Sequence, residues 1–221
     1  MQRIIFSSVV AIIAIVGLIV IANYSGATTA FNSGAGGISV VGGASGANFN
    51  SVAQDKTPIK GDAQYSLASA KQWAVARGAT DRFIAAADIY WEIGKMMGLR
   101  PDVMYAQAAK ETAFGNYTGN VREDMNNFAG IKTATAAGDK TSDHETFASV
   151  RDGIMAHYNH MGAYVGVAPV GEVHERYYSV MTTAWAGSIR YVEELGGKWA
   201  PAEDYGISVV RDYLMTMDEA K

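Results

Sequence analysis

The sequence predicts a mainly helical domain that is preceded by a membrane-spanning helix and a flexible linker. Three observations support this prediction. From Ala63 onward, apolar residues recur at helical spacing and alternating strand patterns are nearly absent. Before that point, a stretch rich in Gly, Ala and Ser follows an N-terminal run that carries no charge. We therefore divide the chain into residues 1–23, 24–62 and 63–221.

The first segment, residues 1–23, is expected to lie in a membrane. No charged residue occurs from Ile4 to Ala22, and a helix of this length spans about 28 Å, close to the thickness of a bilayer's hydrocarbon core. The run is longer than the usual core of a signal peptide, and no small-residue cleavage site directly follows it. We expect a single-pass anchor in the cell membrane, with the domain outside the cytoplasm. Secretion after cleavage at Ala27 or Ala30 is the alternative.

Residues 24–62 are expected to form the linker. Small and polar residues dominate, as in 33–37 and 42–46. Few side chains there could bury enough apolar area to offset the loss of chain entropy. A flexible chain of this length has a root-mean-square span of about 35 Å, so the domain could act some distance from the membrane.

The helices of the domain can be placed from their boundary residues. Gly78 is expected to end a first helix over 65–77, and Thr80 or Asp81 to cap a second that runs to Met97. Pro101 favours the start of a third helix, which reaches about residue 114. Residues 115–140 are rich in Gly, Asn and Thr and predict one long loop or short hairpin. Further helices are expected at 151–164, around 172–181, at 188–195 and at 204–218.

Composition excludes several classes of protein. The net charge is −4, whereas a nucleic-acid-binding domain needs a basic face, so we expect no nucleic-acid partner. The absence of cysteine excludes disulfides and thiolate metal sites. His157 and His160 lie one helical turn apart, but no third ligand is evident, so we expect no metal and no cofactor.

Glu111 is the carboxylate whose surroundings suggest catalysis. It follows Ala108 by one helical turn and Met104 by two, so its face of the helix is largely apolar. Apolar surroundings and a helix C-terminus both raise the pKa of a carboxyl group. A general acid at neutral pH needs this property, because it must hold a proton to donate. Judged by residue type alone, however, a Glu in a last turn is more often simply solvated.

Two segments carry a resemblance to a known family. Residues 106–115 read Ala-Gln-Ala-Ala-Lys-Glu-Thr-Ala-Phe-Gly, and residues 126–132 read Asn-Asn-Phe-Ala-Gly-Ile-Lys. Together they resemble the signature of the bacterial glucosaminidase family of peptidoglycan hydrolases, which are mannosyl-glycoprotein endo-beta-N-acetylglucosaminidase-like. Residues 147–164 resemble the helix that follows the family's catalytic loop. Residues 197–206 resemble its Tyr-Ala-Thr-Asp-x-x-Tyr element, with Trp199 in the first aromatic place. The similarity extends from about Pro101 to Leu214.

The resemblance implies a lysozyme-like helical fold with a sugar-binding cleft beside the loop. The partner would be the glycan strand of peptidoglycan, cut at N-acetylglucosamine, with Glu111 as general acid. Asn127, Phe128 and Lys132 would shape the floor of the cleft and hold the loop against the Glu111 helix. Trp199 and Tyr205 would offer flat surfaces to sugar rings and a hydroxyl donor, although residue type alone favours core packing equally.

A second catalytic group is expected on the loop. Many members of the family carry a second acid after the Gly-Ile-Lys motif, and Glu145 takes that place here, with Asp143 as a neighbour on the same side of an extended segment. We expect Glu145 to activate water, while a route through the sugar's own acetamido group would need no second carboxylate. A lytic transglycosylase and a non-catalytic peptidoglycan-binding module are the alternative functions.

Overall fold

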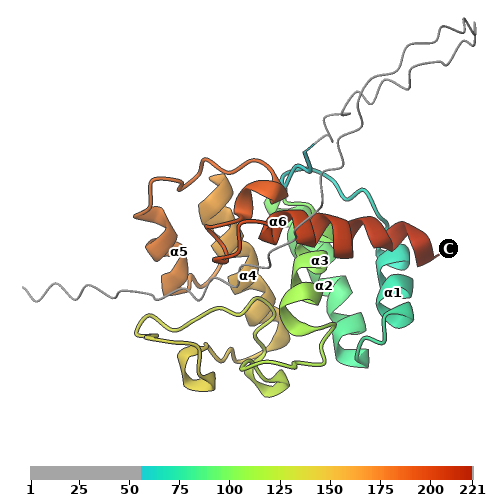
Figure 1. Ribbon diagram of the computed structural model, residues 1–221, viewed down its shortest axis with the longest axis horizontal. Coiled ribbons are helices and arrows are strands. Elements are labelled where there is room, and N and C mark those ends of the chain that lie inside the picture. The colour runs from blue at the N-terminus through green and yellow to red at the C-terminus, as the bar shows by residue number, and fades with distance from the viewer. Residues whose placement is uncertain (1–55, 221) are drawn as a thin grey trace, which may run out of the picture. The chain divides into compact units, whose positions relative to one another are not determined.

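The computed structural model describes residues 56–220 and contains six α-helices within them (Figure 1). The helices are α1 (Leu67–Ala76), α2 (Asp81–Met97), α3 (Pro101–Thr112), α4 (Val150–Val165), α5 (Glu175–Met181) and α6 (Tyr205–Ser208). The last of these continues as a π-helical segment, η4 (Val209–Leu214), and a 3-10 segment, η5 (Met215–Ala220). Three further 3-10 turns are η1 (Glu123–Met125), η2 (Thr141–Asp143) and η3 (Val192–Leu195). Backbone pairing within residues 56–220 is limited to isolated bridges, so the predicted mainly helical class is confirmed.

The helix boundaries follow the expected capping residues. The Thr80 side chain accepts a hydrogen bond from the backbone of Phe83 and begins α2, while Gly98 ends it in a left-handed conformation. Pro101 occupies the first turn of α3. Local sequence therefore sets the length and direction of the two helices that precede the site.

The helix predicted at 188–195 is wrong over its first half. Only 192–195 is helical, as the η3 turn. The preceding residues pair with the N-terminal segment instead, since Ile59 donates its amide to the Arg190 carbonyl at 3.1 Å and Pro58 forms a bridge with Tyr191. Backbone pairing with a distant segment has replaced helical hydrogen bonds at these residues.

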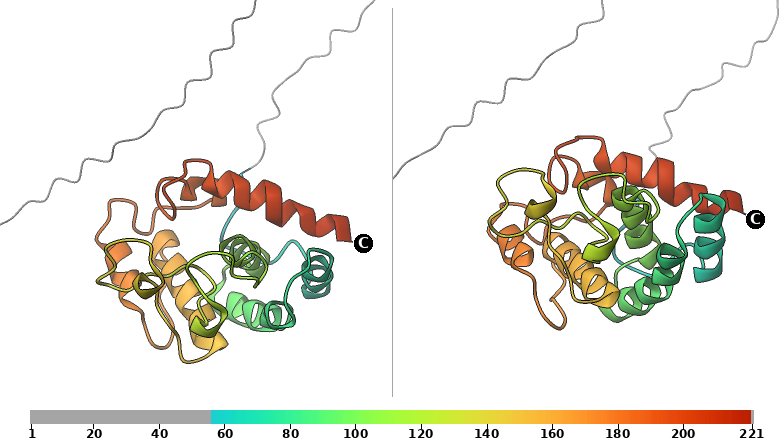
Figure 2. Two further views of the ribbon diagram at one scale, coloured as in Figure 1. Left: turned by 60° about the horizontal axis from the view of Figure 1, so that its bottom comes forward. Right: turned by 90° about the horizontal axis from the view of Figure 1, so that it is seen from below.

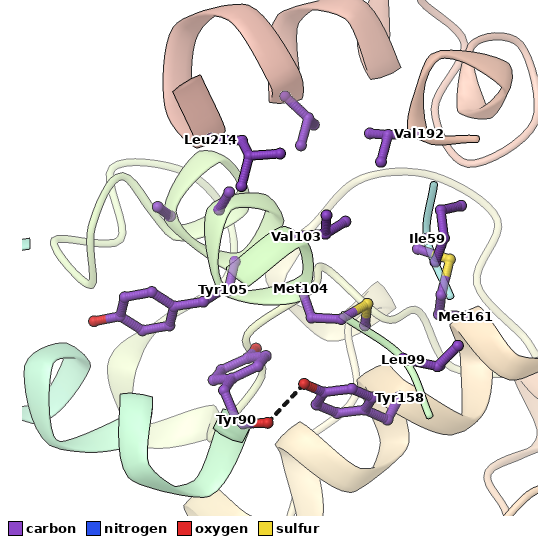
Figure 3. Close-up of a cluster of buried hydrophobic side chains, with 14 of the residues drawn as sticks. Ile59, Tyr90, Leu99, Val103, Met104, Tyr105, Tyr158, Met161, Val192 and Leu214 are labelled. Carbon is purple, nitrogen blue, oxygen red and sulfur yellow. Dashed lines mark hydrogen bonds between the residues drawn. The ribbon is translucent and has the colours of Figure 1, made fainter. Parts of the chain in front are cut away.

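The core is built around α3. Every residue from Pro101 to Ala109 is buried, and the helix packs against α2 and the η4 segment. Figure 3 shows Met104 and Tyr105 of α3 among side chains from the surrounding elements, with the Tyr158 hydroxyl bonded to the Tyr90 carbonyl at 2.7 Å. A helix surrounded in this way has little freedom to move, so residues in its last turn are held firmly.

The N-terminal boundary of the domain lies earlier than residue 63. Ile59, which we expected in the linker, is fully buried. Its carbonyl accepts the amide of Arg100 at 2.9 Å, and Lys60 forms a bridge with Leu99. Residues 57–61 are therefore part of the packed domain. The remainder of the predicted linker up to residue 55, and the predicted anchor at residues 1–23, lie outside the described residues. Within residues 56–220, no helix is both long and apolar enough to cross a membrane.

A loop over residues 113–149 connects the end of α3 to the start of α4 (Figures 1 and 2). A single antiparallel bridge joins Lys132 and His144, so the loop has the form of a minimal hairpin. Gly153 of α4 allows the loop to approach closely, because a Cβ there would lie 1.7 Å from the carbonyl oxygen of Asn126. The loop is thus fixed to α4 on one side and to α3 at its origin.

Candidate active site

Glu111 lies in the last turn of α3, where the helix emerges from the core. The helix ends because Ala113 and Phe114 both adopt positive φ angles, of 49° and 58°. Such conformations cost energy in residues other than glycine and are held in place by surrounding structure, often at functional sites. The Thr112 hydroxyl closes the turn by bonding to the Ala108 carbonyl at 2.7 Å. The position of the Glu111 carboxyl is therefore set by the buried helix and by this sharp termination.

The two oxygens of the Glu111 carboxyl have different surroundings. Oε1 accepts a hydrogen bond from Nε1 of Trp199 at 3.2 Å and a second, short one from the hydroxyl of Tyr205. Oε2 lies beside Gly130, 3.4 Å from the place a Cβ would take. No hydrogen bond among the described residues reaches Oε2. One oxygen is thus fixed as an acceptor, and the other remains available.

Burial raises the pKa of Glu111 above that of an ordinary glutamic acid. The hydrogen bonds from Tyr205 and Trp199 and the charge of Lys110 act in the opposite direction, because each stabilises the anion. The rise from burial is the larger effect. This carboxyl therefore retains its proton to a higher pH than an exposed one does, which is the property required of a general acid.

A cavity of about 530 Å³ opens beside Glu111. The loop supplies most of its wall, and the segment before α6 supplies the rest. Its charged groups apart from Glu111 are on the loop: Asp139 pairs with Lys132 at 3.0 Å and with Nε2 of His144 at 3.4 Å. The lining residues are Glu111, Tyr117, Gly119, Asn120, Val121, Ala129, Gly130, Lys132, Asp139, His144, Trp199, Ala200 and Pro201.

Asn127 holds the loop in shape. Its side-chain amide donates to the carbonyls of Ile131 at 2.8 Å and Glu145 at 3.0 Å, and its oxygen accepts the amides of Ala129 and Ile131. Asn127 is fully buried, so these bonds replace water for the polar atoms of its side chain. Phe128 points into the core, where its ring lies 6.4 Å from that of Tyr90. Both residues therefore support the cavity from beneath, while Lys132 lines it.

Comparison with known proteins decides the family. The family model described as glucosaminidase, mannosyl-glycoprotein endo-beta-N-acetylglucosaminidase, matches residues 87–210, more than half of the chain. The chain belongs to the glucosaminidase family. The resemblance predicted from its motifs is thereby confirmed, and membership supports a glycoside hydrolase with a function of the peptidoglycan-hydrolase type.

The glucosaminidase match is accompanied by one distant relative. An uncharacterised protein of Borreliella burgdorferi is 29% identical over 121 residues, which cover 54% of this chain and 55% of that protein. The chain thus spans about half the length of that relative. No solved structure matches the chain.

Glu145, predicted as the second catalytic group of this glucosaminidase, faces a different cavity. The Lys132–His144 bridge makes side chains alternate between the two faces of the hairpin. Lys132 and His144 therefore line the cavity of Glu111, whereas Glu145 lines a neighbouring one of about 660 Å³. There its Oε2 lies 3.0 Å from Nε2 of His174. The structure brings Glu111, Lys132, Trp199 and the Tyr205 hydroxyl together, and it does not bring Glu145 into the same cavity.

Several residues of the site were not predicted from the sequence. Asp139 is the second carboxylate of the Glu111 cavity, but nothing in its exposed Gly-Asp-Lys context marks it. Gly130 lies within the Asn-Asn-Phe-Ala-Gly-Ile-Lys motif, so a glycine inside that motif was the available signal, and the structure gives it a positive φ of 60°. Gln107 precedes Glu111 by four residues and bonds to the Tyr205 hydroxyl at 3.0 Å. Its helical spacing from Glu111 could have identified it.

Proposed function

We propose that this protein hydrolyses the glycan strand of peptidoglycan at N-acetylglucosamine, with Glu111 as the general acid. The observation that supports the proposal is the asymmetry of the Glu111 carboxyl. Oε1 accepts one hydrogen bond from Trp199 and one from Tyr205, while Oε2 lies toward Gly130 in the cavity wall. A proton on this carboxyl therefore belongs on Oε2, where it can reach a bound glycosidic oxygen.

In the proposed reaction the two oxygens of Glu111 have different roles: Oε2 donates the proton and Oε1 accepts the hydrogen bonds that stabilise the anion. The proton passes from Oε2 to the glycosidic oxygen while the bond from that oxygen to the anomeric carbon breaks, and the departing sugar leaves as an alcohol. Glu111 becomes an anion, which the Tyr205 hydroxyl and the Trp199 indole N–H stabilise through Oε1. Water supplies an oxygen to the anomeric carbon, and one of its protons restores Glu111.

Two carboxylates could activate water, and the substrate's acetamido group offers a route that needs neither of them. Glu145 is the residue that the family resemblance favours, but it lines the neighbouring cavity and bonds to His174. Asp139 lies in the cavity of Glu111, and a hydrogen bond from Lys132 lowers its pKa, which keeps it ionised. In the third route the acetamido oxygen of the substrate attacks the anomeric carbon as the bond to the leaving oxygen breaks, and water deprotonated by the Glu111 carboxylate then opens the ring that has formed. We favour the acetamido route, because Glu145 lines the neighbouring cavity and Asp139 is already held in an ion pair with Lys132 and lies 3.4 Å from Nε2 of His144.

Two substitutions separate these routes. Glu145→Gln and Asp139→Asn should each lower kcat by less than about tenfold if the acetamido oxygen is the nucleophile, since loss of a true general base costs about a hundredfold or more. A loss of that size in one variant alone identifies that residue as the base, particularly if azide restores turnover.

The aromatic residues have separate roles in this proposal. Trp199 lines the cavity and can support a sugar ring, and its own ring is held by His160 at 4.7 Å and Tyr164 at 5.5 Å. Tyr205 is only 5% exposed, so its ring face does not meet substrate and its hydroxyl is the part that serves the site.

Product analysis tests the reaction type. The full-length protein should release fragments with a reducing N-acetylglucosamine end from purified peptidoglycan, as identified by mass spectrometry. A lytic transglycosylase also needs only one protonated carboxyl, and fragments with an anhydro ring would establish that reaction instead. Binding to peptidoglycan with no released fragments would establish the non-catalytic module.

We also propose that residues 1–23 anchor the protein in the cell membrane with the domain outside the cytoplasm. The support is the uncharged run from Ile4 to Ala22. Fractionation of cells should recover the full-length chain with membranes, accessible to protease added outside the cytoplasmic membrane. Recovery of a shortened chain in the medium would establish secretion after cleavage.

A further inference from the structure

A chain of buried hydrogen bonds leads from the core to Glu111. The Tyr90 hydroxyl lies 2.9 Å from Nδ1 of His157, and Nε2 of His157 lies 3.0 Å from Oε1 of Gln107. Nε2 of Gln107 donates to the Tyr205 hydroxyl at 3.0 Å, and that hydroxyl donates to Oε1 of Glu111. We call the first four residues the donor chain. They come from four helices, α2, α4, α3 and α6, and none is more than 5% exposed.

The donor chain has one direction in which every proton has an acceptor. Burial lowers the pKa of His157 to about 3, with a further contribution from His160, so the ring is neutral and has one donor and one acceptor. Gln107 turns its oxygen toward His157, which must then donate from Nε2 and accept from Tyr90 at Nδ1. The opposite direction would leave the Tyr90 hydroxyl proton without an acceptor among the described residues.

This direction determines what the Tyr205 hydroxyl does. The Gln107 amide donates an N–H to the hydroxyl oxygen of Tyr205, so the hydroxyl is an acceptor on that side. Its single proton is therefore directed at Glu111. Hydrogen bonds in such a series polarise one another, and each one strengthens the next in a buried setting. We propose that Gln107 and His157 are positioning residues that hold the Tyr205 hydroxyl as a donor to Glu111.

The proposal rests on the function proposed above and adds residues that never touch the substrate. Its consequence is that Oε1 is always an acceptor, so the catalytic proton is confined to Oε2. It also means that the Glu111 anion formed after proton transfer is stabilised by the whole donor chain, through the Tyr205 hydroxyl. The charged and titratable groups around Glu111 are Lys110 on its own helix, Tyr90 on α2, Tyr205 and Tyr213 on the C-terminal helix, and Lys132, Asp139 and His144 on the loop.

The test compares three variants of the full-length protein. Gln107→Met keeps the side-chain volume but removes the amide. His157→Gln keeps an N–H donor toward Gln107. The matched control is Tyr158→Phe, which removes the buried hydroxyl next in sequence to His157, whose bond goes to the Tyr90 carbonyl and not into the donor chain. For each protein the Glu111 carboxyl is titrated by carbon-13 NMR, and kcat is measured against pH on purified peptidoglycan.

We expect Gln107→Met to raise the pKa of Glu111 and move the alkaline limb of the kcat profile to higher pH. It should also lower kcat about tenfold, close to the upper limit for the loss of one neutral hydrogen bond. His157→Gln should keep the pKa of Glu111 and kcat close to those of the unmutated protein, because it keeps a donor toward Gln107. Tyr158→Phe should lower the melting temperature without moving the pKa of Glu111 or the kcat profile. Gln107→Met titrating like the unmutated protein, or Tyr158→Phe shifting the pKa equally, would overturn the proposal.

A second variant and a readout that is independent of catalysis complete the test. If Gln107→Met does not fold, Tyr90→Phe removes only the first hydroxyl of the donor chain and should shift the pKa of Glu111 upward by a smaller amount. No shift in that variant overturns the proposal. The NMR titration needs no catalysis, so it still tests the donor chain if the unmutated protein releases no fragments and the proposed function fails.

Discussion

The hydroxyl of Tyr205 donates a hydrogen bond to Oε1 of Glu111, although the two residues are 94 positions apart in the sequence. Tyr205 begins α6 and Glu111 lies in the last turn of α3, so the contact depends on packing of the C-terminal helix against α3. This packing is continued by the π-helical segment that follows Tyr205. Such segments are rare and occur often at functional sites.

Tyr205→Phe should lower kcat about a hundredfold on purified peptidoglycan, because the Glu111 anion loses a preorganised donor. The alkaline limb of the pH profile should also move to higher pH, since the lost bond stabilised the charged form. The control is Tyr213→Phe, on the same helix, whose ring stacks on Phe114 at 5.8 Å. Equal activity in the Tyr205 and Tyr213 variants would contradict this role.

Glu111→Gln should stabilise the folded protein at about pH 7. Burial raises the folded-state pKa of Glu111, so above the pKa of an unfolded glutamic acid, about 4.3, the native state binds more protons than the unfolded state and loses stability as pH rises. Below that pH both states are protonated and the difference vanishes. Melting temperatures should therefore show a gain from the substitution at about pH 7 and none at about pH 3.5. A gain that is independent of pH would exclude ionisation as the cause.

Asn127→Ala should destabilise the domain by about 2 to 3 kcal/mol, since it leaves the buried backbone amides of Ala129 and Ile131 without their acceptor. The loop over residues 113–149 would also become less rigid, and because it forms most of the wall of the Glu111 cavity, kcat should fall. Asn116→Ala is the control, because that amide is exposed and should cost less than about 1 kcal/mol. Urea unfolding measures both, and equal losses would argue against a special role for Asn127.

Gly130→Ala tests the space beside Oε2. A Cβ there would lie 3.4 Å from Oε2, and the positive φ of 60° adds backbone strain of about 1 kcal/mol. Gly78→Ala is a matched control, with φ of 70° and nothing within 4 Å of the new Cβ. We expect similar losses of stability in the two variants but loss of activity only in Gly130→Ala. Loss of activity in both would point to strain rather than crowding.

Ile59→Ala should cost about 3 kcal/mol, the usual effect of truncating a fully buried isoleucine. It follows that a chain starting at residue 56 should be more stable than one starting at residue 63. Thermal unfolding of the two truncated chains measures the difference. Equal stability would show that residues 57–61 contribute little to the domain.

The local features of the fold could be predicted because they depend on nearby residues. Thr80, Gly98 and Pro101 mark helix ends through their own side chains and backbone preferences, and the structure confirms all three. The helix expected at 188–195 was wrong because Ile59 and Pro58 pair with this segment from far away in the sequence. A pattern of local propensities carries no information on such pairing.

The same division applies to the site. Glu111, Asn127 and Tyr205 could be named from the sequence because short motifs contain them. The bonds that connect Tyr205 to Glu111, and His157 to Gln107, join separate helices and exist only after packing. The opposite orientations of Lys132 and Glu145 depend on the register of one bridge in the loop. That register is set by Asn127, and the sequence offers no alternation from which to derive it.

In the proposed function, Glu111 donates the proton that allows the glycan strand to be cleaved. The most direct measurement is the rate at which the full-length protein releases soluble fragments from purified peptidoglycan, compared with Glu111→Gln and with Glu123→Gln, an exposed carboxylate on η1. We predict that Glu111→Gln lowers the rate by about a thousandfold or more, while Glu123→Gln retains it. Release of fragments by Glu111→Gln at the unmutated rate would contradict the claim.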